Sequence, residues 1–144
     1  MATVVLAEPV SHVLFSNTNI AVKLTVFIGA LLCLTGVAIG AFGAHALADV
    51  LAFNQRQATF ELANRYQFYH GLALLIIGLN PQFCSCKQLF YSTLCLGVGV
   101  VIFSASLYVL AVTNVHWLGA VTPIGGISLL VGWTIYLIGV VRDK

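Results

Sequence analysis

The chain has 144 residues, of which 60% are hydrophobic and 7% are charged, and its formal net charge is +2. A soluble domain carries about 25% charged residues, so this composition excludes an ordinary soluble globular protein. No cluster of basic residues suggests a nucleic acid as partner.

Uncharged runs indicate the class of protein. Leu24–Ala44 holds 21 residues without a charge, and Gln88–Val141 holds 54. A membrane-spanning helix needs about 20 apolar residues, so the first run predicts one span and the second predicts two. A central helix that ends at Leu79 adds another. We therefore expect an all-α, four-helix transmembrane bundle with short loops, with spans at about 24–46, 59–79, 88–112 and 118–141.

Residues 1–21 are expected to form an N-terminal tail that precedes a four-span membrane domain of residues 22–144. Glu8-Pro9 interrupts this tail, and no basic residue occurs before Lys23. The tail therefore lacks the basic region that begins a secretory signal.

Four glycines of the first span share one side of the predicted helix: Gly29, Gly36, Gly40 and Gly43. Small residues let another helix approach closely, and such packing drives helix association in lipid. We expect a packing seam here, with Gly36-x-x-x-Gly40 as its tightest part. His45 ends this helix on the opposite side, as a solvated cap or as a ligand. The polar connection 46–58 is expected to contain a short interfacial helix that merges into the second span.

The second span is polar from Glu61 to His70 and apolar from Gly71 to Leu79. Measured from Leu79 at about 1.5 Å per residue, His70 lies ~13 Å and Arg65 ~21 Å along the helix. Both fall within a hydrocarbon layer of roughly 30 Å, where ionisable groups normally face a bundle interior or a water-filled cavity. Three interpretations stay open for this stretch: contacts that hold the bundle together, a ligand or solute site, and proton or ion handling.

For His70 we expect a neutral imidazole that donates from one ring nitrogen and accepts at the other. Ser104 and Tyr108 are its first expected partners. Arg65 could instead extend to the near interface, and Glu61–Arg65 could be an ordinary surface ion pair.

The third span has small or polar residues on two opposite faces, so we expect it to lie between neighbouring helices. The fourth span contains Thr122-Pro123, a pair typical of an N-cap and first helical position. If the helix starts near Leu118 instead, Pro123 would kink it. Gly125 and Gly132 of this span are expected to pack against a neighbouring helix.

Chemistry-bearing motifs are few. Cys84-Ser-Cys86 is the only close pair of cysteines, and a structural zinc site needs four ligands, so no metal and no cofactor is expected. There is no His-Glu-x-x-His, no Gly-x-Ser-x-Gly and no nucleophile–base pair at a recognisable spacing. We assign no catalytic residue and do not expect an enzyme.

The distribution of basic residues predicts the orientation. Lys23, Lys87, Arg142 and Lys144 fall on the side that holds both termini, whereas Arg56 and Arg65 fall towards the other. The positive-inside rule then places both termini in the cytoplasm, and we expect the protein in the plasma (inner) membrane.

Four ordered motifs within about Val22–Val141 carry a resemblance to a known family. They are Gly40-Ala-Phe-Gly-Ala-His-Ala-Leu47, Tyr66-Gln-Phe-Tyr-His70, Phe103-Ser-Ala-Ser-Leu-Tyr108, and Thr122-Pro-Ile-Gly-Gly126 followed by Gly132-Trp133. With these motifs the chain resembles the domain-of-unknown-function family 423, which is related to transmembrane protein 256. Ala105 stands where the family usually has glycine, and Gly71 lies where it usually has alanine. The resemblance implies a small four-helix integral membrane protein and leaves the molecular activity open.

Placed on the predicted helices, the polar residues form one layer near one membrane side. Its candidate members are His45, Glu61, Arg65, Tyr66, Gln67, His70, Ser104 and Tyr108. The favoured interpretation is a structural or accessory membrane component, which this layer locks together or docks onto a partner. The alternative is a small-molecule binding or permeation protein that uses Tyr66–His70, and an intramembrane enzyme is the third and least favoured interpretation. The expected partners are the lipid bilayer and either further copies of the chain or a larger membrane complex.

Overall fold

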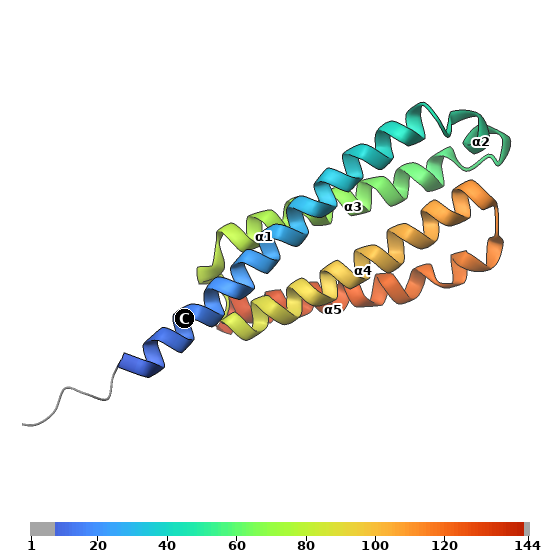
Figure 1. Cartoon of the computed structure of the whole chain (residues 1–144). Helices are drawn as coiled ribbons and strands as arrows, with labels where there is room; N and C mark the ends of the chain where they lie inside the picture. The colour runs from blue at the N-terminus through green and yellow to red at the C-terminus, as the bar shows by residue number, and fades with distance from the viewer. Residues whose placement is uncertain (1–7, 143–144) are drawn as a thin grey trace, which may run out of the picture.

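The computed structural model describes the chain from Glu8 to Arg142, and its side chains from residue 20 onward. Within this part the regular elements are all helices, with no strand, so the all-α expectation is confirmed. In chain order they are α1 (Glu8–Ala44), α2 (Ala48–Phe53), α3 (Gln57–Leu79), η1 (Pro81–Phe83), α4 (Cys86–Thr113), η2 (His116–Ala120) and α5 (Thr122–Arg142) (Figure 1). The tail expected at residues 1–21 stays a prediction, since residues 1–7 lie outside the described chain and α1 already begins at Glu8.

Three segments are long and apolar enough to cross a membrane. They are Ile20–Ala44 in α1, Cys86–Thr113 in α4, and His116–Arg142, which joins η2 to α5. α3 has 23 residues, about 34 Å of helix, but its first half is too polar for it to belong to this group. Between Glu8 and Arg142 the fold therefore has five α-helices, and α1, α4 and α5 contain the three candidate spans by length and composition.

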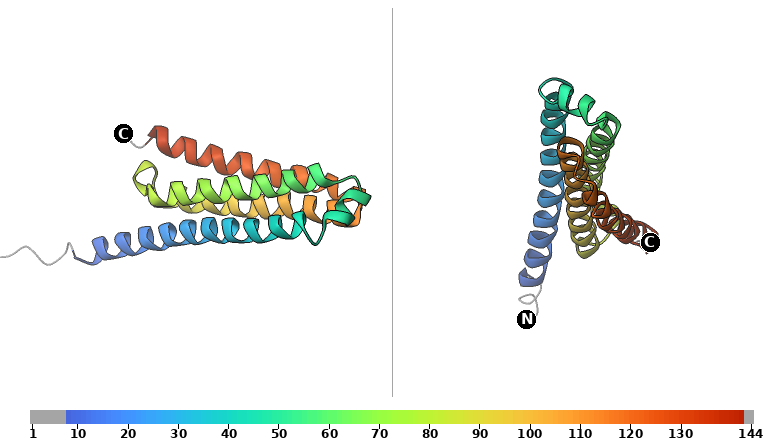
Figure 2. Two further views of the ribbon diagram at one scale, coloured as in Figure 1. Left: turned by 90° about the horizontal axis from the view of Figure 1, so that it is seen from above. Right: turned by 90° about the vertical axis from the view of Figure 1, so that its right-hand side faces the viewer.

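The four long helices lie side by side, and α5 ends at the same end of the bundle where α1 begins, opposite α2 (Figure 2). α4 is the central helix. Along one face Ser92 Oγ donates to the carbonyl of Gly132 at 2.9 Å, and the hydroxyls of Ser106 and Thr122 lie 3.0 Å apart. These contacts place α5 antiparallel to α4. Ser104 on the opposite face contacts α3, so the two small-residue faces of α4 do meet different neighbours.

α1 packs along α3 and also contacts α4. The buried hydroxyls of Thr25 and Thr93 lie 2.7 Å apart, and three to four residues further along each helix Ile28 lies against Gly97. Because the residue numbers rise together on the two helices, α1 and α4 run parallel.

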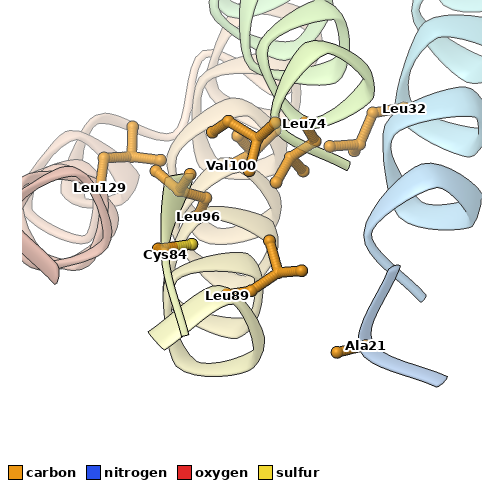
Figure 3. Close-up of a cluster of buried hydrophobic side chains, with 9 residues drawn as sticks. Ala21, Leu32, Leu74, Cys84, Leu89, Leu96, Val100 and Leu129 are labelled. Carbon is orange, nitrogen blue, oxygen red and sulfur yellow. The ribbon is translucent and has the colours of Figure 1, made fainter. Parts of the chain in front are cut away.

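The apolar core runs through the middle of the bundle, where all four long helices contribute side chains (Figure 3). Leu74 of α3 and Leu96 of α4 are fully buried, and Leu32 of α1 and Leu129 of α5 pack around them. Most other large apolar side chains point outward, as expected where lipid and not water covers a helix.

The connection between α1 and α3 differs from the expectation. α2 does not merge into α3, because Gln55 has a φ of 55° and breaks the helix. The side-chain amide of Asn54 donates to the carbonyls of Ala111 and Val112 at 3.1 and 2.8 Å, and Arg56 Nε donates to Asn114 Oδ1 at 3.2 Å. The break therefore anchors this connection to the end of α4.

The fourth predicted span had two expected helix starts. Residues 116–120 form η2 and α5 begins at Thr122, so of the two expected helix starts the structure has the one at Thr122. Pro123 lies in the first turn of α5, where its missing N–H leaves no helical hydrogen bond unmade. The alternative of a kink at Pro123 is thereby excluded.

Candidate functional site: a buried polar layer and an adjoining cavity

Gln67 lies at the centre of a buried layer between three helices. Its side chain is 5% exposed. Nε2 donates to the carbonyl of Leu32 at 3.1 Å and to Thr35 Oγ1 at 2.8 Å, both in α1. Oε1 accepts from the hydroxyl of Tyr108 in α4 at 2.9 Å. One amide on α3 thus joins α1 to α4.

Asn64 lies one turn before Gln67 on α3 and extends the layer. Its Nδ2 donates to the carbonyl of Gly36 at 2.7 Å and to the Tyr108 hydroxyl at 3.2 Å. Ser104 Oγ donates to the carbonyl of Ala63 at 2.9 Å. We call Thr35, Asn64, Gln67, Ser104 and Tyr108 the Gln67 layer.

The Gln67 layer is closed within the bundle. Over the residues whose side chains are described, no buried side-chain nitrogen or oxygen lacks a hydrogen-bond partner. In hydrocarbon no water can replace a missing partner, so these bonds favour one fixed arrangement of α1, α3 and α4. The layer therefore has no unpaired buried side-chain nitrogen or oxygen that could bind a ligand.

His70 belongs to a second, half-exposed cluster, and the partners expected for it were wrong. Its Nδ1 lies 2.8 Å from the carbonyl of Tyr66, one turn back on α3, and the indole N–H of Trp133 donates to its Nε2 at 3.3 Å. An indole N–H can only donate, so Nε2 accepts and Nδ1 carries the proton. The ring of His70 therefore contacts α5. Ser104 and Tyr108 of α4 instead bond to Ala63 and Gln67 of α3.

Tyr66 continues this cluster. Its ring stacks on Phe103 with centroids 4.5 Å apart, and it lies 5.9 Å from the ring of His70. The cluster links α3, α4 and α5 on the outside of the bundle, where Tyr66 is 37% exposed. It is separate from the Gln67 layer, so the single layer expected from the sequence divides into two.

His45, Glu61 and Arg65 join neither set. All three are exposed, and His45 lies in the turn that follows α1. Glu61 and Arg65 line a cavity of about 570 Å³ between α1, α2 and α3. We call it the α1–α3 cavity; its lining residues are Gly40, Gly43, Ala44, Ala48, Leu51, Gln57, Phe60, Glu61, Asn64 and Arg65.

The four glycines of α1 face α3, but the distance between the two helices varies along this seam: Gly29, Gly36, Gly40 and Gly43. A Cβ on Gly29 would lie 2.9 Å from the carbonyl oxygen of Gly71, whereas on Gly36 it would make an ordinary contact with Phe68 at 3.5 Å. At Gly40 the nearest atoms belong to the side chain of Asn64, and at Gly43 to the ring of Phe60. We expected the backbones of α1 and α3 to be closest at Gly36 and Gly40, and this was wrong. Long side chains of α3 lie opposite both glycines: Gln67 and Phe68 at Gly36, and Asn64 at Gly40.

Gly125 and Gly132 face α4 at close range. A Cβ on Gly125 would lie 2.5 Å from the backbone nitrogen of Phe103, and one on Gly132 would lie 2.8 Å from Leu96. Both glycines therefore let α5 approach the central helix.

Three hydrogen-bonding members of the Gln67 layer and the His70 cluster had no place among the sequence candidates: Thr35, Asn64 and Trp133. Asn64 is an uncharged polar residue in the middle of a span, which is itself a signal of an interhelical contact. Thr35 and Trp133 carry no such signal, since a threonine can bond to its own helix and a tryptophan can face lipid. Among the described residues, no three His, Cys, Asp or Glu side chains lie close enough to hold a metal ion.

Comparison with known proteins adds a family and close relatives. The family described as "Protein of unknown function (DUF423)" matches residues 39–126. A UPF0382 membrane protein of Staphylococcus epidermidis is 43% identical over 120 residues, which cover 83% of this chain and 97% of the relative. The UPF0382 inner membrane protein YgdD of Escherichia coli K12 is 37% identical over 108 residues, 75% of this chain and 82% of the relative. No solved structure matches the chain.

Proposed function

This chain belongs to the DUF423 family, and from that premise we propose that it is a four-span integral membrane protein with a structural or accessory role. Its relatives are membrane proteins by name, and three of its helices are apolar enough to cross a bilayer. The proposal concerns the fourth span, the orientation and the role.

The direction of the helices supports a fourth span. α1 and α4 run parallel, so if both cross the membrane, the chain between them has to return to the first side. α3 is the only long helix in that interval, and about 34 Å of helix is enough for a hydrocarbon layer of roughly 30 Å. The Gln67 layer explains how its polar half tolerates that position, since the amides are bonded to α1 and α4 instead of facing lipid.

Both termini are proposed to lie in the cytoplasm. Lys87 lies in the first turn of α4 and Arg142 ends α5, and Lys23 lies two residues before Thr25, which contacts the first half of α4. Arg56 lies between α2 and α3, at the opposite end of the bundle. Short connections rich in Lys and Arg stay on the cytoplasmic side. The printed name of the Escherichia coli relative supports an inner-membrane location.

The observation that carries the structural role is the closure of the Gln67 layer. A permeation path through the bundle needs polar atoms in its interior that face water or a solute. Among residues 20–142, however, every buried side-chain nitrogen and oxygen has a hydrogen-bond partner. An intramembrane hydrolase would need a nucleophile beside a base, but Ser104 donates to the carbonyl of Ala63 and His70 lies in the other cluster. The role proposed is therefore to hold or complete a membrane assembly, of this chain or of a larger complex.

Native electrophoresis tests this role. The protein, tagged and expressed at its natural level, would be extracted with a mild detergent and compared with overexpressed, purified protein in the same detergent. We expect the natural-level sample to migrate as a larger species than the purified chain. Ser104→Ala should reduce the amount of folded chain and of the larger species in parallel. Identical migration of the two samples at the size of one chain would contradict an accessory role.

A further inference from the structure

The α1–α3 cavity lies at the end of the bundle that carries α2. Gly40 and Gly43 of α1, Leu51 of α2, and Phe60 and Asn64 of α3 all line it, so it lies where these three helices meet. Its volume of about 570 Å³ is within the range of roughly 300–1,000 Å³ that is usual for ligand pockets. The cavity is separate from the Gln67 layer and touches it only at Asn64.

Two opposite charges line the cavity without satisfying each other. Glu61 and Arg65 are one turn apart on α3, a spacing at which such pairs often bond. Yet over residues 20–142 neither side chain has a hydrogen bond or an ion pair. A carboxylate and a guanidinium therefore remain available on one wall, with the amide of Gln57 beside them.

The depth of the cavity places these charges near a membrane surface. Gly40 lies four residues, about 6 Å, from the end of α1 at Ala44. Phe42 and Leu62, the chain neighbours of Gly43 and Glu61, are 63% and 38% exposed. Exposed apolar side chains therefore adjoin the residues that line the cavity, and we call these two the apolar rim. A charged wall beside a lipid-facing rim is the arrangement that a phospholipid head group would meet.

We propose that the α1–α3 cavity binds a phospholipid head group that carries both a phosphodiester and a primary ammonium, of which phosphatidylethanolamine is the simplest. The guanidinium of Arg65 receives the phosphate, because a planar guanidinium pairs with phosphate through two hydrogen bonds. The carboxylate of Glu61 receives the ammonium, which a short linker holds beside the phosphate. Phe60 and Leu51 provide apolar contact for the carbons between and next to these groups.

This assignment distinguishes a zwitterionic lipid from other occupants. An anionic lipid without an ammonium would leave Glu61 facing a phosphate, and like charges at close range disfavour binding. A soluble molecule with the same two groups would satisfy Arg65 and Glu61 but would gain nothing from the apolar rim. The proposal is independent of the structural role, since Glu61 and Arg65 contribute no bond to the bundle.

Native mass spectrometry of the detergent-solubilised full chain tests the proposal. The protein would be titrated with phosphatidylethanolamine, with phosphatidylglycerol of the same acyl chains, and with free O-phosphoethanolamine. We expect one phosphatidylethanolamine to be retained in preference to phosphatidylglycerol, and free O-phosphoethanolamine to compete poorly. Arg65→Gln should weaken retention of phosphatidylethanolamine at least tenfold, which corresponds to about 1.4 kcal/mol. Glu61→Gln should abolish the preference for phosphatidylethanolamine over phosphatidylglycerol.

Lys87→Gln provides the matched control, because it removes an exposed charge at the other end of the bundle and should leave both lipids bound as in the wild type. The melting temperatures of Glu61→Gln and Arg65→Gln should equal that of the wild type, since neither side chain is bonded. Equal retention of the two lipids by the wild type would overturn the proposal. So would unchanged binding in both variants, or competition by O-phosphoethanolamine at the concentration of the lipid.

Discussion

The side-chain amide of Gln67 bonds the polar half of α3 to two neighbouring helices. Gln67 uses both ends of its side chain, since Nε2 bonds to α1 and Oε1 bonds to Tyr108 of α4. Interhelical hydrogen bonds within membranes stabilise by about 0.6 kcal/mol on average and rarely by more than about 1.7 kcal/mol. Three such bonds on one side chain make Gln67 the polar residue whose loss should matter most.

Gln67→Leu tests this at the residue scale. Leucine has a similar volume but makes none of the three hydrogen bonds. The Tyr108 hydroxyl loses its acceptor, and the Leu32 carbonyl loses one of its donors. We expect a loss of about 1–3 kcal/mol in the free energy of unfolding, measured by equilibrium denaturation in detergent. Gln57→Leu, the same change at an exposed position of α3, should have little effect. Equal stability of both variants would show that the layer does not hold the helices together.

The sequence was sufficient to identify Gln67, Ser104 and Tyr108 as members of a polar layer, but not to pair them. Their residue types and depth follow from helix periodicity, whereas their partners depend on which side of α3 meets which helix. His70 shows the difference, because its residue type and depth were predictable and its partners were predicted wrongly. The sequence does not show that His70 bonds to the carbonyl of Tyr66, one turn back on its own helix, and to the indole of Trp133, 63 residues away.

At the scale of the elements, the α1–α3 contact depends on glycines that face each other. A stripe of glycines on α1 predicts that some helix approaches it, but the distance depends on the opposite surface. Gly29 meets Gly71, so the two backbones come close. Gly36 meets the larger side chains of Gln67 and Phe68, which keep the backbones apart. Which residue of α3 lies opposite each glycine depends on the register between the two helices, and the sequence does not give that register.

Gly29→Ala should therefore destabilise the bundle, because among the four glycines of this seam Gly29 is the one whose added methyl group would meet backbone atoms of α3. The added Cβ would lie 2.9 Å from the backbone oxygen of Gly71 and the nitrogen of Leu75, and backbone atoms of a packed helix cannot move aside cheaply. We expect a loss of roughly 1–3 kcal/mol, visible as a lower melting temperature in detergent.

Gly126→Ala is the matched control for this change. A Cβ there meets nothing within 4 Å, so the variant should be neutral or slightly more stable, since alanine favours a helix by up to about 1 kcal/mol over glycine. If Gly29→Ala melts at or above the temperature of Gly126→Ala, the close approach of α1 and α3 does not stabilise the bundle.

For the whole molecule, the exposed surface is as informative as the core. α5 packs mainly on α4, and its outer residues Ile127, Leu130 and Leu137 are 63%, 69% and 62% exposed. In water such a surface would drive aggregation, whereas in a bilayer it is the ordinary lipid-facing side of a span. The three apolar helices were predictable from composition alone. α3 was predictable as a helix, but the proposal that it crosses the membrane depends on the parallel direction of α1 and α4.

The central claim is that α3 crosses the membrane, and labelling of single cysteines tests it most directly. The native cysteines would be replaced by alanine, and Phe53→Cys, Gln82→Cys and His116→Cys introduced one at a time at exposed positions of the three connections. In intact cells a membrane-impermeant maleimide should label positions 53 and 116 but reach position 82 only after permeabilisation. Labelling of positions 53 and 82 from the same side of the membrane would show that α3 does not cross, and the four-span account would be wrong.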